Sequence, residues 1–238
     1  MYSAGLLVMA NTLITEKIVP YTLLGMTAVT GLVDAVSFLS LGRVFTANMT
    51  GNVVILAFAT ARVPGLSIAR SLTALLSFLV GAIFGGRIMA RAGADSQIRF
   101  AVQAFLLEVA FLFAASFCSI GYRGDLIEDS FQPFALIALT ALAMGTRNAA
   151  VRKLAIPDLT TTVLTLTITG IGADSSLANG NNPRLARRVE SVVAMFLGAA
   201  LGAVILHYSI SAALWLGTAI SALCSAALFR ALRTPDEL

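Results

Sequence analysis

The sequence predicts an all-α polytopic membrane protein, and three observations support this fold class. The first is composition: of the 238 residues, 58% are apolar and only 12% are charged, and the mean hydropathy is +0.89. A soluble domain carries about 25% charged residues and cannot bury this much apolar surface. The second is a pattern that occurs twice along the chain, and the third is the uneven placement of basic residues between apolar segments.

Eight apolar segments are candidates for membrane helices. A helix that crosses the membrane needs about 20 predominantly apolar residues. The second and sixth segments differ from the others because polar runs at their start shorten their apolar part. The eight segments are residues 19–41, 44–61, 68–89, 100–120, 131–151, 156–171, 189–206 and 210–232.

The placement of basic residues tests how many of these segments cross. If all eight crossed, the basic residues would divide about evenly between the two sides, against the positive-inside rule. If the second and sixth segments enter and leave on the same side, twelve basic residues lie inside, and only Arg43, Arg62, Arg70 and Arg123 lie outside. We therefore expect about six crossing helices plus two short broken or re-entrant segments, with both termini in the cytoplasm.

The repeated pattern divides a single membrane domain, residues 1–238, into repeats at about 18–121 and 130–233. In each copy a helix-length apolar segment ends in a polar cluster, a short segment follows, and a helix with a Gly-x-x-x-Gly step comes next. The glycine steps are Gly81/Gly85 and Gly198/Gly202, which we expect to permit close helix packing. Three crossings per copy would insert the copies as two inverted repeats, whereas eight crossings would give parallel repeats.

Asp34 is the first candidate for a functional residue. It lies about two-thirds of the way along the first segment, where a charged carboxylate costs several kcal/mol unless it is paired, hydrated or protonated. Thr27, Thr30, Gly31 and Ser37 recur with it at helical spacing and form a polar stripe. The stripe favours a functional role for Asp34, although a satisfied network of hydrogen bonds between helices would produce the same pattern.

The second segment opens with TANMTGN, which contains the candidate binding residues Asn48, Thr50 and Asn52. Asn, Gly and Thr are weak helix formers, so we expect an unwound stretch followed by a half-helix. Free carbonyls and the N-terminus of the half-helix could then bind an ion or an anionic group. The alternative is a polar turn at the membrane surface.

The matching run in the second copy is PDLTTT, with the candidates Asp158, Thr160 and Thr161. Pro157 has no backbone N–H, and either Asp158 or Thr160 is a good N-cap for a helix whose positive end faces the site. Alternatively, the threonines bond only to their own backbone. We expect both polar runs to be non-helical or kinked, to face the protein interior, and to approach each other near the repeat axis.

Three further polar residues lie in long apolar segments. Arg147 and Asn148 occupy the repeat position equivalent to that of Thr30–Asp34. Arg147 would pair with an intramembrane carboxylate or an anionic substrate, or would extend to the membrane interface. Glu108 lies midway along the fourth segment, where it is a candidate for proton coupling or a neutral structural residue.

At TGLVDAVSFLSLGRVFTANMTGN, and again at PDLTTTVLT, the sequence resembles the YoaK family of bacterial integral membrane proteins, which is defined by domain of unknown function 1275. The resemblance covers residues 21–232. Its specific motifs are Gly-x-x-Asp at Gly31/Asp34, Met-Thr-Gly-Asn at 49–52 and Pro-Asp-Leu-Thr-Thr-Thr at 157–162. It implies about six membrane helices and a multi-pass location in the bacterial cytoplasmic (inner) membrane, but no substrate and no established site.

These features predict a small-solute secondary transporter or permease with a midplane site at the repeat interface, where Asp34 or Glu108 carries a coupling proton. The alternative is a non-transporting membrane scaffold or a subunit of a larger complex. The residues predicted to bind the solute are Asp34, Asn48, Thr50, Asn52, Arg147, Asn148, Asp158, Thr160 and Thr161.

Catalysis is not expected, because the chain has no phosphate loop, zinc motif or Ser–His–Asp set. One histidine, His207, cannot build a His-rich metal site, and no cofactor is expected. The net charge of +4 reflects the side of the membrane on which basic residues lie and not nucleic-acid binding. The expected partners are membrane lipid and an unidentified small solute, with a homo-oligomer left open.

Overall fold

The computed structural model describes residues 18–93, 96–124, 131–159, 161 and 164–233, and within these residues all regular secondary structure is helical. Thr160, one of the predicted binding residues, lies outside the described residues. The helices are α2 (Val19–Ser40), α3 (Met49–Thr60), α4 (Ile68–Met89), α5 (Gln97–Cys118), α6 (Phe131–Leu154), α7 (Thr165–Ala173), the 3₁₀ helix η3 (Ser176–Ala178), α8 (Leu185–Leu206) and α9 (Ile210–Arg233).

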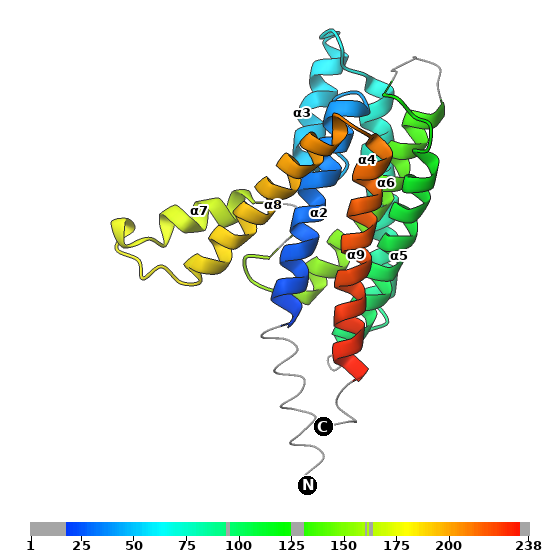
Figure 1. Ribbon diagram of the computed structural model, residues 1–238. Helices are drawn as coiled ribbons and strands as arrows, with labels where there is room; N and C mark the ends of the chain where they lie inside the picture. Colours follow the sequence, from blue (N-terminus) through cyan, green and yellow to red (C-terminus); the bar gives the residue numbers. More distant parts are fainter. Residues whose placement is uncertain (1–17, 94–95, 125–130, 160, 162–163, 234–238) are drawn as a thin grey trace.

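Six of these helices are long and apolar enough to cross a membrane, namely α2, α4, α5, α6, α8 and α9. Each has 22 or 24 residues, which at about 1.5 Å per residue spans the roughly 30 Å of a bilayer core. Helices α3 and α7 have 12 and 9 residues and are too short to cross. The prediction of six crossing helices plus two short segments is confirmed. The start of α2 and the end of α9 lie at the same end of the bundle (Figure 1).

Two helix pairs form the closest seams of the bundle: α4 packs on α6, and α2 packs on α8. A side chain at Gly81 would collide with the carbonyl oxygen of Leu142, and one at Gly198 would collide with that of Ala28. The glycines therefore let the backbones of neighbouring helices touch, as predicted.

Two glycines outside the predicted glycine steps, Gly145 and Gly31, complete these seams. A side chain at Gly145 would collide with the carbonyl oxygen of Phe78, and one at Gly31 would collide with that of Met195. Each seam thus has a glycine on both helices. The first helix of each predicted repeat packs on the third helix of the other in the same way, and α2 and α6 run in opposite directions (Figure 1). This matching supports the inverted repeats, which remain a prediction.

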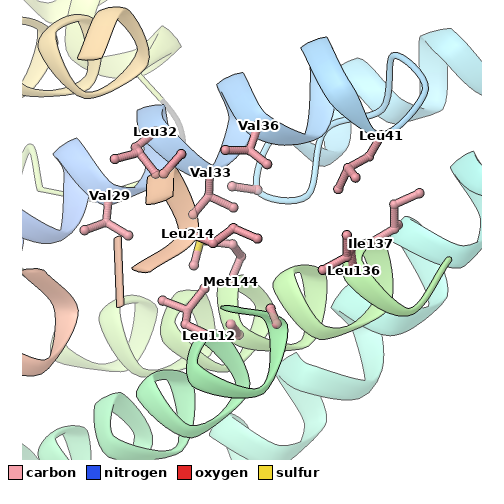
Figure 2. Packing of buried hydrophobic residues seen from close by; sticks show 14 of the residues in the cluster. Val29, Leu32, Val33, Val36, Leu41, Leu112, Leu136, Ile137, Met144 and Leu214 are labelled. Carbon is pink, nitrogen blue, oxygen red and sulfur yellow. The ribbon is translucent and has the colours of Figure 1, made fainter. Parts of the chain in front are cut away.

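The interior contains two apolar clusters, one of which is drawn in Figure 2. Along α5, Leu112 belongs to the first cluster and Phe105 to the second, with Glu108 between them. Along α6, Met144 belongs to the first, Ala150 to the second, and Arg147 lies between. The two apolar clusters therefore enclose a thin polar layer near the middle of the bundle.

The two short helices lie apart from each other. Helix α3 packs against α4, α7 packs against α8, and no contact joins the described residues of α3 and α7. Helix α7 and the first part of α8 extend sideways from the bundle (Figure 1). The predicted approach of the two short segments near the repeat axis is therefore not seen between these helices.

Both polar runs were expected to be non-helical or kinked, but the first is partly helical, and only the described residues of the second lie entirely outside helices. Residues 46–48 are non-helical, whereas Met49–Asn52 form the first turn of α3. Residues 157–159 and 161 are likewise outside any helix. Asp158 and Thr161 have positive φ angles of 64° and 61°, which non-glycine residues adopt uncommonly. The chain ahead of α7 is thus held in an irregular conformation.

Candidate functional site

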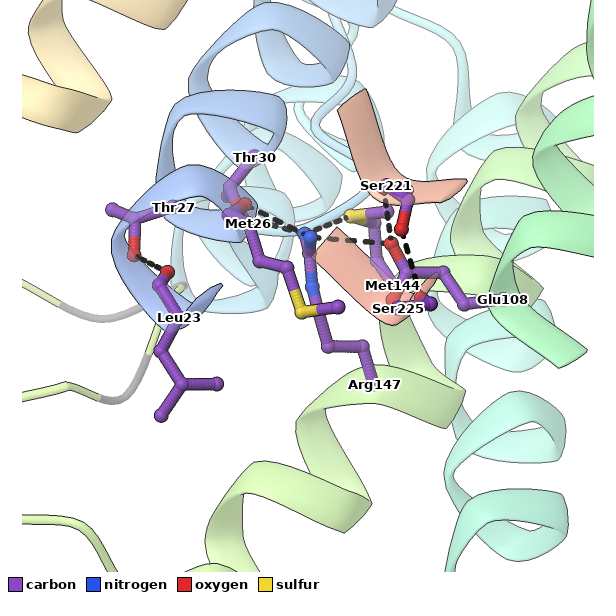
Figure 3. A network of polar contacts seen from close by, with 9 residues as sticks. All are labelled: Leu23, Met26, Thr27, Thr30, Glu108, Met144, Arg147, Ser221 and Ser225. Atoms are coloured by element: carbon purple, nitrogen blue, oxygen red, sulfur yellow. Dashed lines mark hydrogen bonds and ion pairs between the residues drawn. The ribbon is translucent and has the colours of Figure 1, made fainter. Parts of the chain in front are cut away.

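The polar layer is built around an ion pair between Glu108 and Arg147, whose side chains are fully buried. Glu108 Oε1 lies 3.2 Å from Arg147 Nη1. The guanidinium crosses from α6 to α2, where Nη1 donates to the carbonyl oxygen of Met26 at 2.8 Å and Nη2 donates to Thr30 Oγ1 at 2.6 Å (Figure 3). Ser221 on α9 donates its hydroxyl to Glu108 Oε1 at 3.0 Å. Four membrane helices therefore meet at this pair.

The pair leaves hydrogen-bonding capacity unused. Glu108 Oε2 and Arg147 Nε have no hydrogen-bond partner among the described residues, although both atoms are buried. Burying an ion pair costs several kcal/mol per ion, and geometry together with additional hydrogen bonds must offset this cost. An oxygen of Glu108 thus remains available for a proton or for another donor.

Asp34 anchors a different structure, the loop before α3. Its side chain is 6% exposed, and Oδ1 accepts the backbone N–H groups of Thr46 at 3.1 Å and Ala47 at 2.9 Å. Asp34 is one helical turn beyond Thr30, and its carboxylate lies within electrostatic reach of Arg147. Asp34 thus connects the loop to the polar layer.

Asn52 closes the same loop from the other side. Its side-chain oxygen accepts the backbone N–H of Phe45 at 2.9 Å, and its Nδ2 donates to the carbonyl oxygen of Phe45. Asn52 is fully buried, Asn48 is half-buried at the helix start, and Thr50 is exposed. In TANMTGN the structure therefore assigns a loop-holding role to Asn52 and an outward position to Thr50.

Asp158 belongs to a third group, at the base of α8. Its two carboxylate oxygens accept hydrogen bonds from Arg184 at 2.7 Å and Arg188 at 3.0 Å. Arg188 also pairs with Asp174 at 2.8 Å, and so ties α7 to α8. Partial burial raises the pKa of Asp158, but the hydrogen bonds from Arg184 and Arg188 outweigh burial and hold that pKa below its usual value.

The predicted site residues thus fall into separate groups. Arg147 and Glu108 form the central pair, Asp34 and Asn52 hold the loop before α3, and Asp158 holds the base of α8. Asn48 and Thr50 lie at the start of α3 and contribute no side chain to these groups, and Thr161 is buried. Asn148 lines a groove on the outer side of the α4–α6 seam.

A polar vestibule opens at the end of the bundle opposite the start of α2. It has a volume of about 570 Å³ and lies where α2, α5 and the α8–α9 turn meet. Ser119 at its wall is followed inward by Ser116, whose hydroxyl is 2.9 Å from that of Thr218. Ser221 lies one turn further along α9 and bonds to Glu108. Buried hydroxyls therefore lead from the vestibule to the ion pair.

These hydroxyls and Arg188 are the residues that sequence reasoning missed. Thr218, Ser221 and Ser225 recur at helical spacing in the last segment, and this spacing was the available signal. Arg188 lies in a cluster of basic residues of the kind that is common at the cytoplasmic end of a membrane helix. Nothing in the sequence therefore indicated that it pairs with Asp158. Among the described residues, no group of three or more His, Cys, Asp or Glu could hold a metal ion.

Comparison with known proteins identifies the family. The family model described as Protein of unknown function (DUF1275) matches residues 22–227. The chain is 37% identical over 157 residues to the UPF0700 transmembrane protein YoaK of Bacillus subtilis (strain 168), covering 65% of this chain and 67% of that relative. No solved structure matches the chain. With a family match over most of its length and six helices able to span a membrane, the chain is an integral membrane protein that belongs to the DUF1275 family.

Proposed function

We propose that this protein is a small-solute secondary transporter or permease of the bacterial cytoplasmic membrane, not an enzyme, with Glu108 as its proton-coupling residue. The observation that carries the proposal is the fully buried Glu108–Arg147 pair in the polar layer. Ionisable residues at membrane depth are costly and usually mark substrate or proton pathways. The structure would then represent an occluded state between the two access states.

Cost argues against a purely structural role for the pair. Replacing a buried ion pair with apolar residues of similar volume is often neutral or stabilising, so such a pair is weak evidence for stability. Glu108 and Arg147 also retain the unpartnered atoms Oε2 and Nε. A functional requirement explains why both charges are present.

The coupling step follows from the shared use of Arg147. When Glu108 is ionised, it pairs with Arg147 and occupies the guanidinium. When Glu108 takes up a proton, it loses its negative charge, and Arg147 becomes free to bind a carboxylate or phosphate group of the solute, for which a guanidinium is well suited. Release of the proton restores the ion pair and displaces the solute. One proton and one anionic group would thus move together.

Access from one side is supported by the vestibule and the buried hydroxyls of Ser119, Ser116, Thr218 and Ser221. Access from the other side requires a rearrangement. The matching glycine seams, α2 on α8 and α4 on α6, support rocking of two inverted repeats about the polar layer. The excess of basic residues at the end where α2 begins supports cytoplasmic termini.

Binding measurements on purified protein test this proposal. The probes are small mono- and dicarboxylates and phosphate esters, assayed by thermal shift at pH 5 and pH 8. We expect at least one probe to stabilise the wild type more at pH 5, and E108Q to bind it equally at both pH values. R147Q should lose the stabilisation, whereas R62Q, which removes an exposed charge just after α3 and away from the polar layer, should keep it. Probe binding that is unaffected in R147Q would contradict the proposed site.

A non-transporting membrane scaffold is the second candidate, and the tight interior favours it. Side chains at Glu108 and Arg147 are fully buried, and none of the described grooves reaches them. If the core is permanently packed, water never reaches Glu108. Infrared difference spectra recorded between two pH values separate the candidates, because the carboxyl stretch reports protonation of Glu108. A transporter should show a protonation signal that is missing in E108Q, whereas a scaffold should show no such signal.

A further inference from the structure

We infer that the groove between α4 and α6 binds an anionic phospholipid. The groove has a volume of about 520 Å³, within the usual range of small-molecule sites. Its walls are apolar along α4 and become polar and basic along α6. The lining residues are Phe78, Ala82, Gly86, Asn148, Ala149, Arg152 and Lys153.

The order of these residues along the membrane normal matches a phospholipid. Phe78, Ala82 and Gly86 lie four residues apart on one face of α4, and together they extend about 12 Å along the helix. Phe78 is in the middle of α4, whereas Gly86 is close to its end at Met89. The deep part of the groove is therefore apolar, as an acyl chain requires, and the shallow part lies at the level of lipid headgroups.

The shallow part carries the charge that an anionic headgroup needs. Arg152 and Lys153 are exposed in the last turn of α6, and neither forms an ion pair within the described part of the chain. Basic pockets between membrane helices bind anionic lipid headgroups, and each basic residue near the surface contributes to the attraction. An anionic phospholipid fits this arrangement better than a neutral one.

Helix packing alone does not account for the basic pair. Arg152 and Lys153 follow Gly145 by seven and eight residues, whereas the residues at the same distance after Gly31 are Phe38 and Leu39. Helix α2 makes the matching glycine seam and ends with no basic residue in its last turn. The same seam is therefore built without a basic pair at the end of α2.

Gly86 supplies the space for the ligand. A Cβ at Gly86 would meet nothing within 4 Å, so the position is open, unlike Gly81 and Gly85 in the seam. Gly86 follows Gly81 by five residues, and the residue five positions after Gly198 in the other repeat is Ala203, so the helix seam itself does not require a glycine here. Gly86→Leu would fill the groove without disturbing the seam or changing the charge. Two kinds of substitution can thus test lipid binding independently: one fills the groove, and the other removes its positive charge.

The experiment adds phosphatidylglycerol, phosphatidylcholine or glycerol phosphate to purified protein in detergent and measures bound lipid by native mass spectrometry, together with the melting temperature. We expect phosphatidylglycerol to bind and stabilise the wild type more than phosphatidylcholine does. R152Q/K153Q should weaken phosphatidylglycerol binding by roughly 30-fold, in keeping with two basic residues close to the headgroup. G86L should abolish binding at this groove while preserving the lipid-free melting temperature.

The control is R62Q/R123Q, which removes two basic residues at the opposite end of the bundle and should leave phosphatidylglycerol binding unchanged. Equal binding by R152Q/K153Q and the wild type would overturn the inference, as would equal binding by G86L. Stabilisation by glycerol phosphate as large as that by phosphatidylglycerol would show that the apolar groove has no role, and would also overturn it.

Discussion

The carboxylate of Glu108 and the guanidinium of Arg147 lie 3.2 Å apart, with no exposed side-chain surface on either residue. They come from adjacent helices, α5 and α6, and are joined to α2 through Thr30 and to α9 through Ser221. A movement that separates α5 from α6, or either of them from α2 or α9, would break one of these contacts. The coupling between the two residues therefore reports on the packing of these four helices.

The first prediction concerns the coupling between these two residues. E108Q leaves Arg147 as an unpaired buried charge and should cost about 3–5 kcal/mol of stability, and R147Q should cost a similar amount. The double variant should lose much less than the sum of the two, which a double-mutant cycle of chemical unfolding measures. E190Q, which removes an exposed carboxylate in the first turns of α8, is the control and should change stability little. Additive losses would show that the pair is not coupled.

The second prediction concerns the glycine seams. Gly145→Ala forces a methyl group against the carbonyl oxygen of Phe78, and Gly31→Ala forces one against Met195. Overpacking of this kind typically costs 1–3 kcal/mol, so we expect each variant to lose about that much stability. Gly172→Ala, where a Cβ would meet nothing within 4 Å, should be tolerated and serves as the control. If Gly172→Ala lowers the melting temperature as much as the seam variants do, the proposed close packing at the seams is wrong.

The third prediction concerns Asp34. Asp34→Asn keeps an oxygen that accepts the N–H groups of Thr46 and Ala47, so stability should change by less than about 1 kcal/mol. Binding of an anionic probe to Arg147 should change more, because the variant removes a negative charge within electrostatic reach of the guanidinium. Asp34→Leu leaves both N–H groups without that acceptor and should cost about 2 kcal/mol or more as well. Thermal unfolding and probe binding are measured on both variants. Small and equal effects of Asp34→Asn on both measurements would leave only a structural role.

The fourth prediction concerns pH and the attachment of α7 to α8. Because the folded pKa of Asp158 lies below its unfolded value, its contribution to stability is present above the usual Asp pKa of about 4 and is lost as pH falls through the folded pKa. The protection factors of the α7 amides, which correct for the intrinsic pH dependence of exchange, should therefore fall on acidification below about pH 4 in the wild type. In Asp158→Asn this dependence should be weaker. An unchanged pH profile in the variant would exclude Asp158 as its cause.

Sequence reasoning recovered the architecture because membrane helices are specified by length, apolarity and charge placement. Helices α4 and α6 begin at the residues where their apolar segments were drawn. The charge argument also separated α3 and α7 from the crossing helices, although both lie in apolar segments. Segment length and apolarity are properties of each segment, and the distribution of basic residues is a property of the whole chain. All three can be determined from the sequence without a structure.

The site was harder to predict because it depends on which helices meet. Glu108 and Arg147 were each identified as suspicious, but their pairing depends on the contact between α5 and α6. Asp158 was expected to face a shared site, yet Arg184 and Arg188 bind it at the base of α8. Spacing along one helix cannot specify partners on another.

The fifth prediction concerns orientation. In a variant without Cys118 and Cys224, single cysteines are placed at Pro64, between α3 and α4, and at Gly93, just after α4. The connection between α3 and α4 and the last turn of α4 lie at opposite ends of the bundle (Figure 1). A thiol reagent that does not cross membranes should label Pro64→Cys in intact cells and Gly93→Cys only after lysis. Labelling of Gly93→Cys in intact cells would place the basic end outside.

Proton movement in proteoliposomes tests the central claim most directly. Protein is reconstituted into vesicles that contain a pH-sensitive dye. The carboxylate or phosphate ester that stabilises the wild type best is then added outside, so that its concentration gradient points into the vesicles. The account predicts acidification of the lumen with the wild type and none with E108Q, although E108Q still binds the probe. Acidification by E108Q at the wild-type rate would contradict the assignment of the coupling proton to Glu108.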